Sequence, residues 1–355
     1  MHGGDIYRNQ VDIDFSVNIN SLGMPLSVEN ALKDAVGKCT CYPDIKAERL
    51  IRAISRLTGA AYENIICGNG ASELFPAVIR AVKPEKIMIP VPSFYGYEKA
   101  AASEECEVIY YQMKEKDGFC LTEEILNELR EDLDVLILAN PNNPVGNKIE
   151  PELLTEITKK CAENKIRLII DECFIEFTEN AQEYSMLSKT ERYPNLIIVR
   201  AFTKIFAIPG VRLGYLVCSD SELNEKIRKQ LPEWNLSVFA QEAGCAAADE
   251  IRFIEKTVEQ TRKERVYLKQ KLQQSGIKVF DGTANFLMLY SSIPLKEELL
   301  KEKILIRDCS NFRGLGKGYY RVAVKSEEQN RILICETEKI LGQKGQAADG
   351  RIDDM

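Results

Sequence analysis

Residues 200–214 have the sequence Arg200-Ala201-Phe202-Thr203-Lys204-Ile205-Phe206-Ala207-Ile208-Pro209-Gly210-Val211-Arg212-Leu213-Gly214. They follow an apolar run, residues 196–199, that is typical of a buried strand. The phenylalanines and isoleucine around Lys204 bias its amine toward the neutral, nucleophilic form. Such an amine can form a Schiff base with an aldehyde, while Thr203 and Arg212 can hold a phosphate group. The alternative is a surface lysine beside a structural arginine, and the neighbouring motifs argue against it.

Two further strand-like segments end in polar residues. Residues 134–139 run into Asn140-Pro141-Asn142-Asn143-Pro144-Val145-Gly146, and residues 167–170 run into Asp171-Glu172. We therefore expect Asp171 at the carboxyl end of a strand, where open α/β sheets place their ligands. A buried carboxylate there would keep a pyridine nitrogen protonated and make the ring an electron sink. An ordinary helix cap or turn residue is the alternative for Asp171.

Together, the strand-end asparagine loop, the strand-end aspartate and the lysine–arginine pair resemble the fold-type I pyridoxal-phosphate enzymes, the aspartate aminotransferase superfamily. The resemblance implies an α/β protein with the fold-type I PLP-dependent transferase fold. Its large domain would have a mostly parallel sheet covered on both faces, beside a smaller α+β C-terminal domain. The implied cofactor is pyridoxal 5'-phosphate, with Lys204 and Asp171 as catalytic residues and with Thr203 and Arg212 in the phosphate pocket.

The hydrophobic pattern divides the chain into four parts. We assign residues 1–30 to an N-terminal arm that belongs to the small domain. Residues 31–245 alternate short apolar strands with amphipathic helices, which predicts the large cofactor-binding domain. Residues 246–342 begin with a long charged helix and continue with strands, which predicts the smaller domain. We expect the polar tail, residues 343–355, to be disordered.

The composition excludes several classes of function. A formal net charge of -7 argues against nucleic-acid and membrane partners. The sequence has no apolar run of membrane-spanning length and no secretory signal at its start. Its 11 cysteines form no C-x2-C pair, and with His2 as the single histidine the usual zinc and Ser-His-Asp sites are excluded. We therefore expect a cytoplasmic enzyme with reduced thiols.

The resemblance implies further cofactor-binding residues. Gly70, Ala71 and Ser72 follow a strand and open a helix, where backbone N–H groups can hold the cofactor phosphate. Phe94 matches the aromatic residue that stacks on the pyridine ring, and a core aromatic would fit the sequence equally well. Asn142 matches the asparagine that hydrogen-bonds the ring hydroxyl.

One implied contact crosses to a second subunit. Tyr42 matches a tyrosine that reaches the cofactor phosphate of the neighbouring subunit. The resemblance therefore implies a homodimer with shared active sites.

Two arginines in the C-terminal domain are candidates for substrate binding. Arg307 and Arg321 lie in strand-like segments, where an isolated arginine is usually a surface residue. A guanidinium inside a site would instead bind a carboxylate or phosphate with two hydrogen bonds. Arg321 matches the residue that binds the substrate carboxylate in the superfamily. Two arginines suit a small phosphorylated amino acid, as in the histidinol-phosphate aminotransferase branch.

Within that branch, the N-terminal residues are similar to the L-threonine-O-3-phosphate decarboxylase family of cobalamin synthesis. The similar segments are His2-Gly3-Gly4-Asp5-Ile6 and residues 14–23, and they imply that His2, Gly3 and Asn18 lie near the substrate. A frayed terminus is the alternative for His2. Phe174 replaces a tyrosine whose hydroxyl bonds the cofactor ring oxygen in aminotransferases. The implied reaction converts L-threonine O-3-phosphate to (R)-1-amino-2-propanol O-2-phosphate.

Other functions share the same motifs. A histidinol-phosphate-type aminotransferase or a phosphoserine decarboxylase would need the same cofactor residues, because the reaction type depends on how the substrate is oriented. A non-catalytic regulator with this fold usually has an added DNA-binding module or lacks the lysine. This chain has Lys204 and an N-terminal arm too short for a helix-turn-helix unit.

Overall fold

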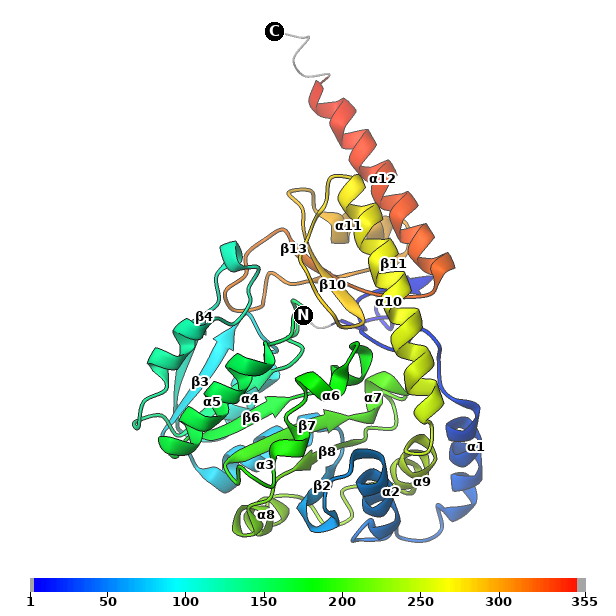
Figure 1. Cartoon of the computed structure of the whole chain (residues 1–355). Helices are drawn as coiled ribbons and strands as arrows, with labels where there is room; N and C mark the ends of the chain where they lie inside the picture. The colour runs from blue at the N-terminus through cyan, green and yellow to red at the C-terminus, as the bar shows by residue number, and fades with distance from the viewer. Residues whose placement is uncertain (1–2, 350–355) are drawn as a thin grey trace.

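The computed structural model describes residues 3–349 and has a large α/β domain with a smaller domain above it (Figure 1). Within those residues the large domain contains a seven-stranded sheet. In spatial order its strands are β2 (Ile65–Gly68), β8 (Gly214–Val217), β7 (Leu196–Ala201), β6 (Arg167–Asp171), β5 (Val135–Ala139), β3 (Lys86–Val91) and β4 (Glu107–Gln112). Strand β8 is antiparallel to both of its neighbours, and the other neighbouring pairs are parallel. The prediction of a mostly parallel α/β sheet is confirmed.

Both faces of this sheet are covered, and successive residues of a strand enter different cores. Ile87 and Ile89 of β3 pack into one core, whereas Met88 packs into the other. The first core is closed by helices α3 (Ala71–Val82), α4 (Gly96–Ala101) and α8 (Ser221–Arg228). The second is closed by α2 (Glu48–Thr58), α5 (Pro151–Glu163) and α9 (Val238–Ala247). Burial on both faces explains why these strands are apolar at nearly every position.

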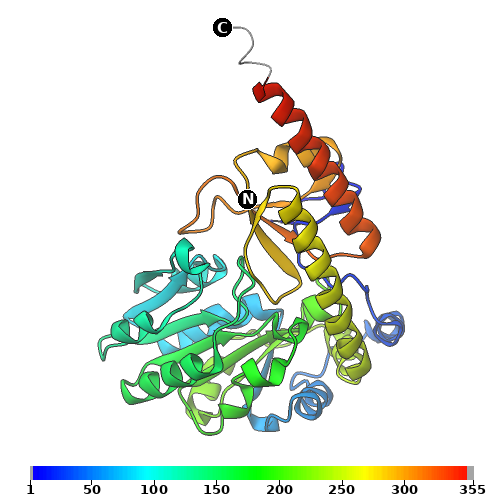
Figure 2. The ribbon, with the colours of Figure 1, turned by 45° about the horizontal axis from the view of Figure 1, so that its top comes forward.

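The small domain has a four-stranded antiparallel sheet. Its order is β12 (Arg307–Asp308), β13 (Tyr319–Ala323), β10 (Phe286–Tyr290) and β9 (Lys278–Val279). Helices α10 (Ile251–Gln274) and α12 (Glu327–Asp349) lie side by side against it (Figure 2). In the N-terminal arm, β1 (Ile13–Asp14) pairs in parallel with β11 (Ile304–Leu305). The arm therefore packs with the small domain.

Shorter helices complete the chain. They are α1 (Leu26–Ala35), which packs against α9, and α6 (Ala181–Tyr184), α7 (Phe202–Ile205) and α11 (Leu295–Lys301). Turns of 3-10 helix occur at Val36–Lys38, Tyr62–Asn64, Glu115–Asp117, Glu123–Glu128, Ile175–Phe177 and Leu187–Lys189.

The end of the chain differs from our expectation of a disordered tail from residue 343. Helix α12 continues to Asp349, so residues 343–349 are helical. The glutamines, lysine and alanines in this segment are good helix formers and extend the helix that precedes them. The rest of the expected tail, residues 350–355, lies outside the described residues.

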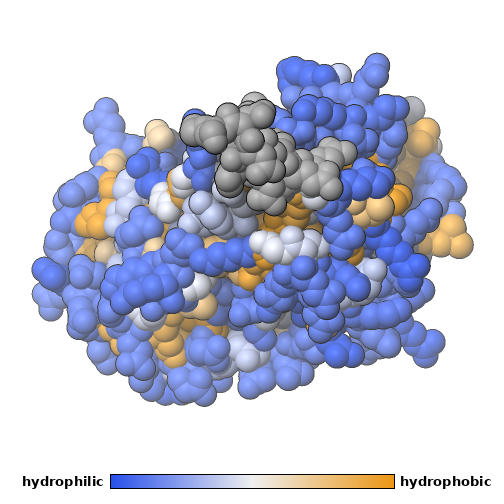
Figure 3. All heavy atoms as spheres, turned by 90° about the horizontal axis from the view of Figure 1, so that it is seen from above, coloured by the Kyte–Doolittle hydropathy of each residue, from blue (hydrophilic) through white to orange (hydrophobic). Residues whose placement is uncertain are grey.

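Among residues 3–349, no helix is long and apolar enough to cross a membrane. Viewed from the end where α12 rises, the surface is mostly hydrophilic, with apolar residues in separate small areas (Figure 3).

Candidate active site

A cavity of about 400 Å³ lies where the N-terminal arm and the small domain meet the carboxyl edge of the large sheet. Most of the predicted site residues line it. They are Gly3, Asn18, Gly70, Ala71, Ser72, Phe94, Asp171, Phe174, Thr203, Lys204, Arg212, Arg307 and Arg321. Residues from across the whole sequence therefore meet at one place, as the strand-end argument predicts.

Lys204 reaches the cavity from α7, the single helical turn that follows β7. Burial lowers the pKa of the Lys204 amine, and the positive charges of Arg321 and Arg212 lower it further, against the opposing effects of Cys173 and Asp171. A lowered pKa increases the neutral fraction of the amine, which is the nucleophilic form. Lys204 is thus buried and its pKa is lowered, as its apolar neighbours in the sequence predict.

The start of α3 lines the cavity beside Arg212. Gly70 precedes this helix with a φ of 75°, and a Cβ at Gly70 would lie 2.5 Å from Nη2 of Arg212. The Arg212 guanidinium donates to Ser72 Oγ (2.9 Å) and to the Pro209 carbonyl (3.3 Å). Free N–H groups at a helix start and a nearby guanidinium together favour an anion.

Asp171 ends strand β6 and is held by two donors. The Tyr97 hydroxyl donates to Oδ2 (2.6 Å), and the Cys173 backbone N–H donates to Oδ1 (2.9 Å). Burial raises the pKa of the Asp171 carboxyl, whereas these two hydrogen bonds oppose the rise. The carboxylate is thereby oriented at the edge of the cavity, where it can face a positively charged partner.

The asparagine loop is arranged differently from our expectation. Asn142 lies outside the cavity and uses its Nδ2 to donate to the Pro92 carbonyl (3.0 Å). Asn143 lines the cavity instead, and its Oδ1 accepts a hydrogen bond from Arg321. Both asparagines lie in the loop that follows β5, and the path of this loop turns their side chains in different directions. The structure therefore brings Asn143 to the cavity and leaves the predicted Asn142 outside it.

Two aromatic residues line the cavity as expected. Phe94 makes ring contacts with Tyr95 and Tyr97, at centroid distances of 4.7 Å and 5.6 Å. Phe174 is buried and packs edge-on against Phe286 at 5.1 Å. The Phe174 position therefore supplies the cavity with an apolar wall and no hydroxyl.

Arg307 and Arg321 are direct partners in the antiparallel pairing of β12 with β13. Their side chains consequently lie on the same face of the small sheet, and both are almost fully buried. Arg307 donates to Asn311 Oδ1 (2.8 Å) and to the Asp308 carbonyl. Arg321 donates to the Ser16 carbonyl (2.9 Å) and to the asparagine oxygen described above.

The hydrogen-bond acceptors of Arg307 and Arg321 are all uncharged. Among the described residues, neither guanidinium forms an ion pair with a carboxylate, and Nε of Arg321 has no hydrogen-bond partner. Burial lowers the pKa of Arg307, and it lowers that of Arg321 to about 10, which is still well above neutral pH. Two adjacent buried cations with neutral partners make a strong anion site.

The N-terminal arm closes this end of the cavity. A Cβ at Gly3 would lie 2.4 Å from the Ser16 carbonyl oxygen, so the arm approaches as closely as a glycine permits. Asn18 is 3% exposed, and among the described residues its Oδ1 has no hydrogen-bond partner. His2, the other predicted residue of the arm, lies outside the described residues.

Tyr42 does not reach the cavity of its own chain. Its side chain is 81% exposed and its ring lies 4.8 Å from that of Trp234, which is also exposed. This position leaves the cross-subunit role of Tyr42 as a prediction.

Several lining residues were missed by the sequence analysis. They are Ser16, Val17, Phe75, Tyr95, Asn143, Cys173, Ala201 and Phe312, together with Tyr97 behind Asp171. Of these residues, only Asn143 could have been found from a sequence motif, since it stands next to Asn142, which was predicted in its place.

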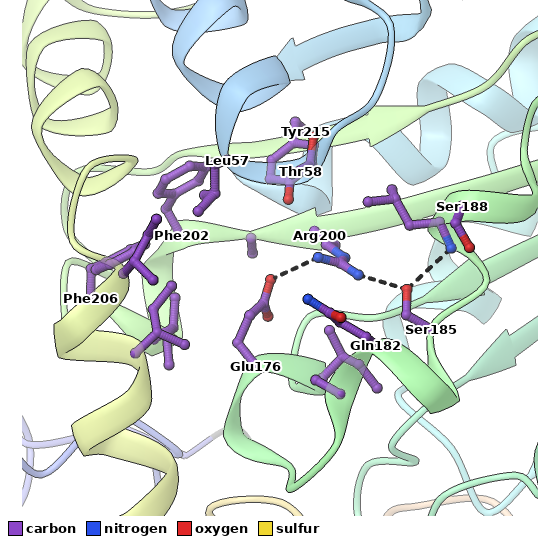
Figure 4. A pocket seen from close by; sticks show the side chains of 17 residues that line it. Leu57, Thr58, Glu176, Gln182, Ser185, Ser188, Arg200, Phe202, Phe206 and Tyr215 are labelled. Atoms are coloured by element: carbon purple, nitrogen blue, oxygen red, sulfur yellow. Dashed lines mark hydrogen bonds and ion pairs between the residues drawn. The ribbon is translucent and has the colours of Figure 1, made fainter.

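A second cavity, of about 600 Å³, lies on the opposite side of α7 (Figure 4). Phe202 and Ile205 line it, whereas Thr203 and Lys204 line the first cavity. At its floor Arg200 forms an ion pair with the fully buried Glu172 (2.7 Å). The same guanidinium contacts two further residues that Figure 4 labels, Glu176 (3.4 Å) and Ser185 (2.7 Å). This network fixes the end of β7 four residues before Lys204.

The fold and the cavity define a class of enzyme. The chain belongs to the aminotransferase class I and II family, whose model matches residues 10–336. Enzymes of this family use pyridoxal 5'-phosphate, and the cavity fits that cofactor. The start of α3 beside Arg212 suits its phosphate, Asp171 suits its ring nitrogen, and the lowered pKa of Lys204 suits its aldehyde.

Individual proteins within this family show what the chain is most usefully compared with. The threonine-phosphate decarboxylase of Salmonella typhimurium is 38% identical over 93% of this chain and 91% of its own length. The adenosylcobalamin biosynthesis bifunctional protein CobDQ of Leptospira interrogans is 32% identical over 94% of this chain, which matches 40% of that protein. The crystal structure of histidinol-phosphate aminotransferase from Clostridium acetobutylicum superposes with a TM-score of 0.87 at 34% identity, covering 93% of this chain and 99% of that chain.

Proposed function

We propose that this protein decarboxylates L-threonine O-3-phosphate to (R)-1-amino-2-propanol O-2-phosphate for cobalamin synthesis. The observation that carries the proposal is the adjacent, buried pair Arg307 and Arg321, which has only neutral hydrogen-bond partners among the described residues. A substrate with a carboxylate and a phosphate supplies the two missing anions. The 38% identity to the decarboxylase of Salmonella typhimurium supports this substrate.

The residues that would hold the cofactor surround the lysine. Gly70, Ala71, Ser72, Thr203 and Arg212 would bind its phosphate. Asp171, oriented by Tyr97, would bind the ring nitrogen, Phe94 would lie against the ring, and Asn143 would face the ring oxygen. When bound, pyridoxal phosphate supplies an electron sink for the bond that breaks at the substrate Cα.

In this proposal the protein selects the bond by orienting the substrate. Arg321 would bind the carboxylate and Arg307 the phosphate, and these two contacts would decide which bond at the substrate Cα is aligned for cleavage. The bond from Cα to the carboxylate carbon breaks, carbon dioxide leaves, and the electron pair remains with Cα. Lys204 would take up the proton that the substrate ammonium gives up on binding, hold it on Nζ, and deliver it to Cα, which forms the new C–H bond of the amine product. Asn18 and Gly3 close the arm over the substrate and exclude water.

A second candidate is a histidinol-phosphate-type aminotransferase. The 34% identity to the Clostridium acetobutylicum structure favours it. Phe174 favours the decarboxylase, because aminotransferases of the branch place a tyrosine there. A decarboxylase acting on phosphoserine would use the same two arginines, and it differs from the main proposal only by one methyl group on the substrate.

We also propose a cytoplasmic homodimer with shared active sites and with neither nucleic-acid nor membrane partners. The exposed Tyr42–Trp234 pair supports the dimer, since two exposed aromatic rings in contact suit a protein interface.

The test is a paired assay on the purified holoenzyme. Threonine phosphate, phosphoserine and histidinol phosphate are each incubated with the enzyme and 2-oxoglutarate, and carbon dioxide and glutamate are both measured. Carbon dioxide from threonine phosphate without matching glutamate is the expected result. Glutamate from histidinol phosphate, with no carbon dioxide from threonine phosphate, would replace the decarboxylase with the aminotransferase.

A further inference from the structure

The loop of residues 309–318 connects the two substrate arginine strands, β12 and β13, and crosses to the large domain. Most of its residues are exposed, but Phe312 is 4% exposed and lines the active-site cavity. The Arg307 guanidinium lies 5.0 Å from the centre of the Phe312 ring and donates to Asn311 Oδ1 (2.8 Å). This loop therefore holds two of the groups that fix the position of Arg307.

One side chain of the loop forms an ion pair with the large domain. Arg313 donates from Nε to Glu98 Oε1 (2.9 Å) and from Nη2 to Glu98 Oε2 (3.2 Å). Its guanidinium also lies 4.0 Å from the centre of the Tyr110 ring on β4. A two-point ion pair on an aromatic face has much more defined geometry than an ordinary surface pair.

Two more features place the loop close to the large domain. A Cβ at Gly314 would lie 2.7 Å from Nε2 of Gln112, at the end of β4. Leu315 packs against an apolar cluster that joins residues of both domains, namely Met113, Phe119, Val145, Phe280 and Met288. Glu98 itself belongs to α4, four residues after Phe94 of the cavity. The contact thus joins the segment that carries Phe94 to the segment that carries Phe312.

We propose that Arg313 is a positioning residue for substrate binding. By pairing with Glu98 it fixes the 309–318 loop against the large domain, so that Asn311 and Phe312 hold Arg307 in the orientation that binds the substrate phosphate. Arg313 touches neither the cavity nor the reacting atoms, and it acts through Arg307. The inference rests on the proposed function, because it takes Arg307 as a ligand of a phosphorylated substrate.

The kinetic test uses the holoenzyme and threonine phosphate. Arg313→Ala should raise KM roughly ten-fold and leave kcat within about two-fold, because a loosened loop misplaces a binding group and not the lysine. The KM of Arg313→Lys should lie between those of wild type and Arg313→Ala, since an ammonium keeps the charge but loses the two-point pairing. The affinity for pyridoxal phosphate should not change in either variant.

A matched control and a rescue separate positioning from general damage. Arg331 forms a similar exposed pair with Glu327 (2.6 Å) on α12, so Arg331→Ala should leave KM unchanged. Arg313→Glu should raise KM at least as much as Arg313→Ala, and adding Glu98→Arg should recover part of the loss. Equal KM values for Arg313→Ala and Arg331→Ala, or no recovery in the double variant, would overturn the inference.

A second readout does not depend on turnover. Trypsin cleavage after Lys317, within the loop, should be faster in Arg313→Ala than in wild type, and threonine phosphate should slow it in wild type. One outcome is that threonine phosphate slows cleavage after Lys317 in wild type although the enzyme releases no carbon dioxide from it. In that case the decarboxylase proposal fails while the loop inference stands. If carbon dioxide is released but cleavage and KM are the same in both proteins, the loop inference alone fails.

Discussion

Replacing Arg321 with methionine tests the substrate assignment most directly. Arg321 is 7% exposed, and among residues 3–349 its hydrogen-bond partners are the Ser16 carbonyl and Asn143, both uncharged, so a bound carboxylate would give it an anionic partner. Loss of a charged partner from a buried anion costs about 2–5 kcal/mol. At 1.36 kcal/mol per factor of ten, kcat/KM for threonine phosphate should fall roughly 30- to 5,000-fold.

Three ligands show which anion each arginine binds. Arg321→Met should strongly weaken the binding of threonine phosphate. It should leave inhibition by aminopropanol phosphate nearly unchanged, because that product has no carboxylate. Arg307→Met should weaken the binding of both phosphorylated compounds. Plain threonine should bind poorly to wild type, since an unpaired buried arginine penalises a substrate that lacks the phosphate.

The control is a second buried arginine outside the cavity. Arg265 is 6% exposed and contacts Glu179 (3.4 Å) and the Thr283 carbonyl (2.9 Å). Arg265→Met should therefore reduce stability without changing kcat/KM per folded enzyme. An Arg321→Met variant that keeps kcat/KM within three-fold of wild type would refute the assignment of Arg321.

Four further outcomes follow from the site. Borohydride reduction of the holoenzyme should attach the cofactor to Lys204, and recovery of the label on another lysine would contradict this assignment. The folded pKa of Lys204 lies below 10.5, so its ammonium destabilises the cofactor-free protein below the folded pKa, and the penalty disappears as pH rises toward 10.5. Lys204→Met should therefore be the more stable cofactor-free protein in urea at pH 7, with the difference closing by pH 10.5. Mixed Tyr42→Ala and Lys204→Ala subunits should regain activity that neither parent has, and no recovery despite proven subunit exchange would argue against shared sites. Phe174→Tyr should lower the pH of the visible-absorbance transition of the holoenzyme, because the new hydroxyl donates to the cofactor ring oxygen.

The parts of the fold that depend on local pattern could be predicted from the sequence. The strand and helix alternation gave the mostly parallel sheet, and strand-end polar residues marked its ligand-binding edge. Asn142 shows the limit of this approach, since the motif contains two adjacent asparagines and only the backbone path decides which one enters the cavity. The helical extension of α12 was missed because a polar composition was weighed above the helix propensity of its residues.

Relations between distant residues had no local signal. The pairing of Arg307 with Arg321 depends on the register of β12 and β13 across an irregular loop, and a shift of one residue would turn one arginine to the other face. Tyr97 lies 74 residues from the aspartate that it holds, and its hydroxyl looks like any other in an aromatic segment. Such contacts become visible only when the sheet order is known.

The charges on the two sides of α7 show how the protein prepares its lysine. On the Figure 4 side, Arg200 is neutralised by Glu172 and Glu176; although burial alone would lower its pKa, these carboxylates raise it. On the cavity side, Arg212, Arg307 and Arg321 form no ion pair with a carboxylate of the described residues. The paired charges on the Figure 4 side hold the end of β7 in place. On the cavity side, burial together with the positive charges of Arg321 and Arg212 lowers the pKa of Lys204, and the same arginines attract anions. Binding of a phosphorylated cofactor and a doubly anionic substrate would supply the missing counter-charges, so the free energy of binding is concentrated where the lysine must act.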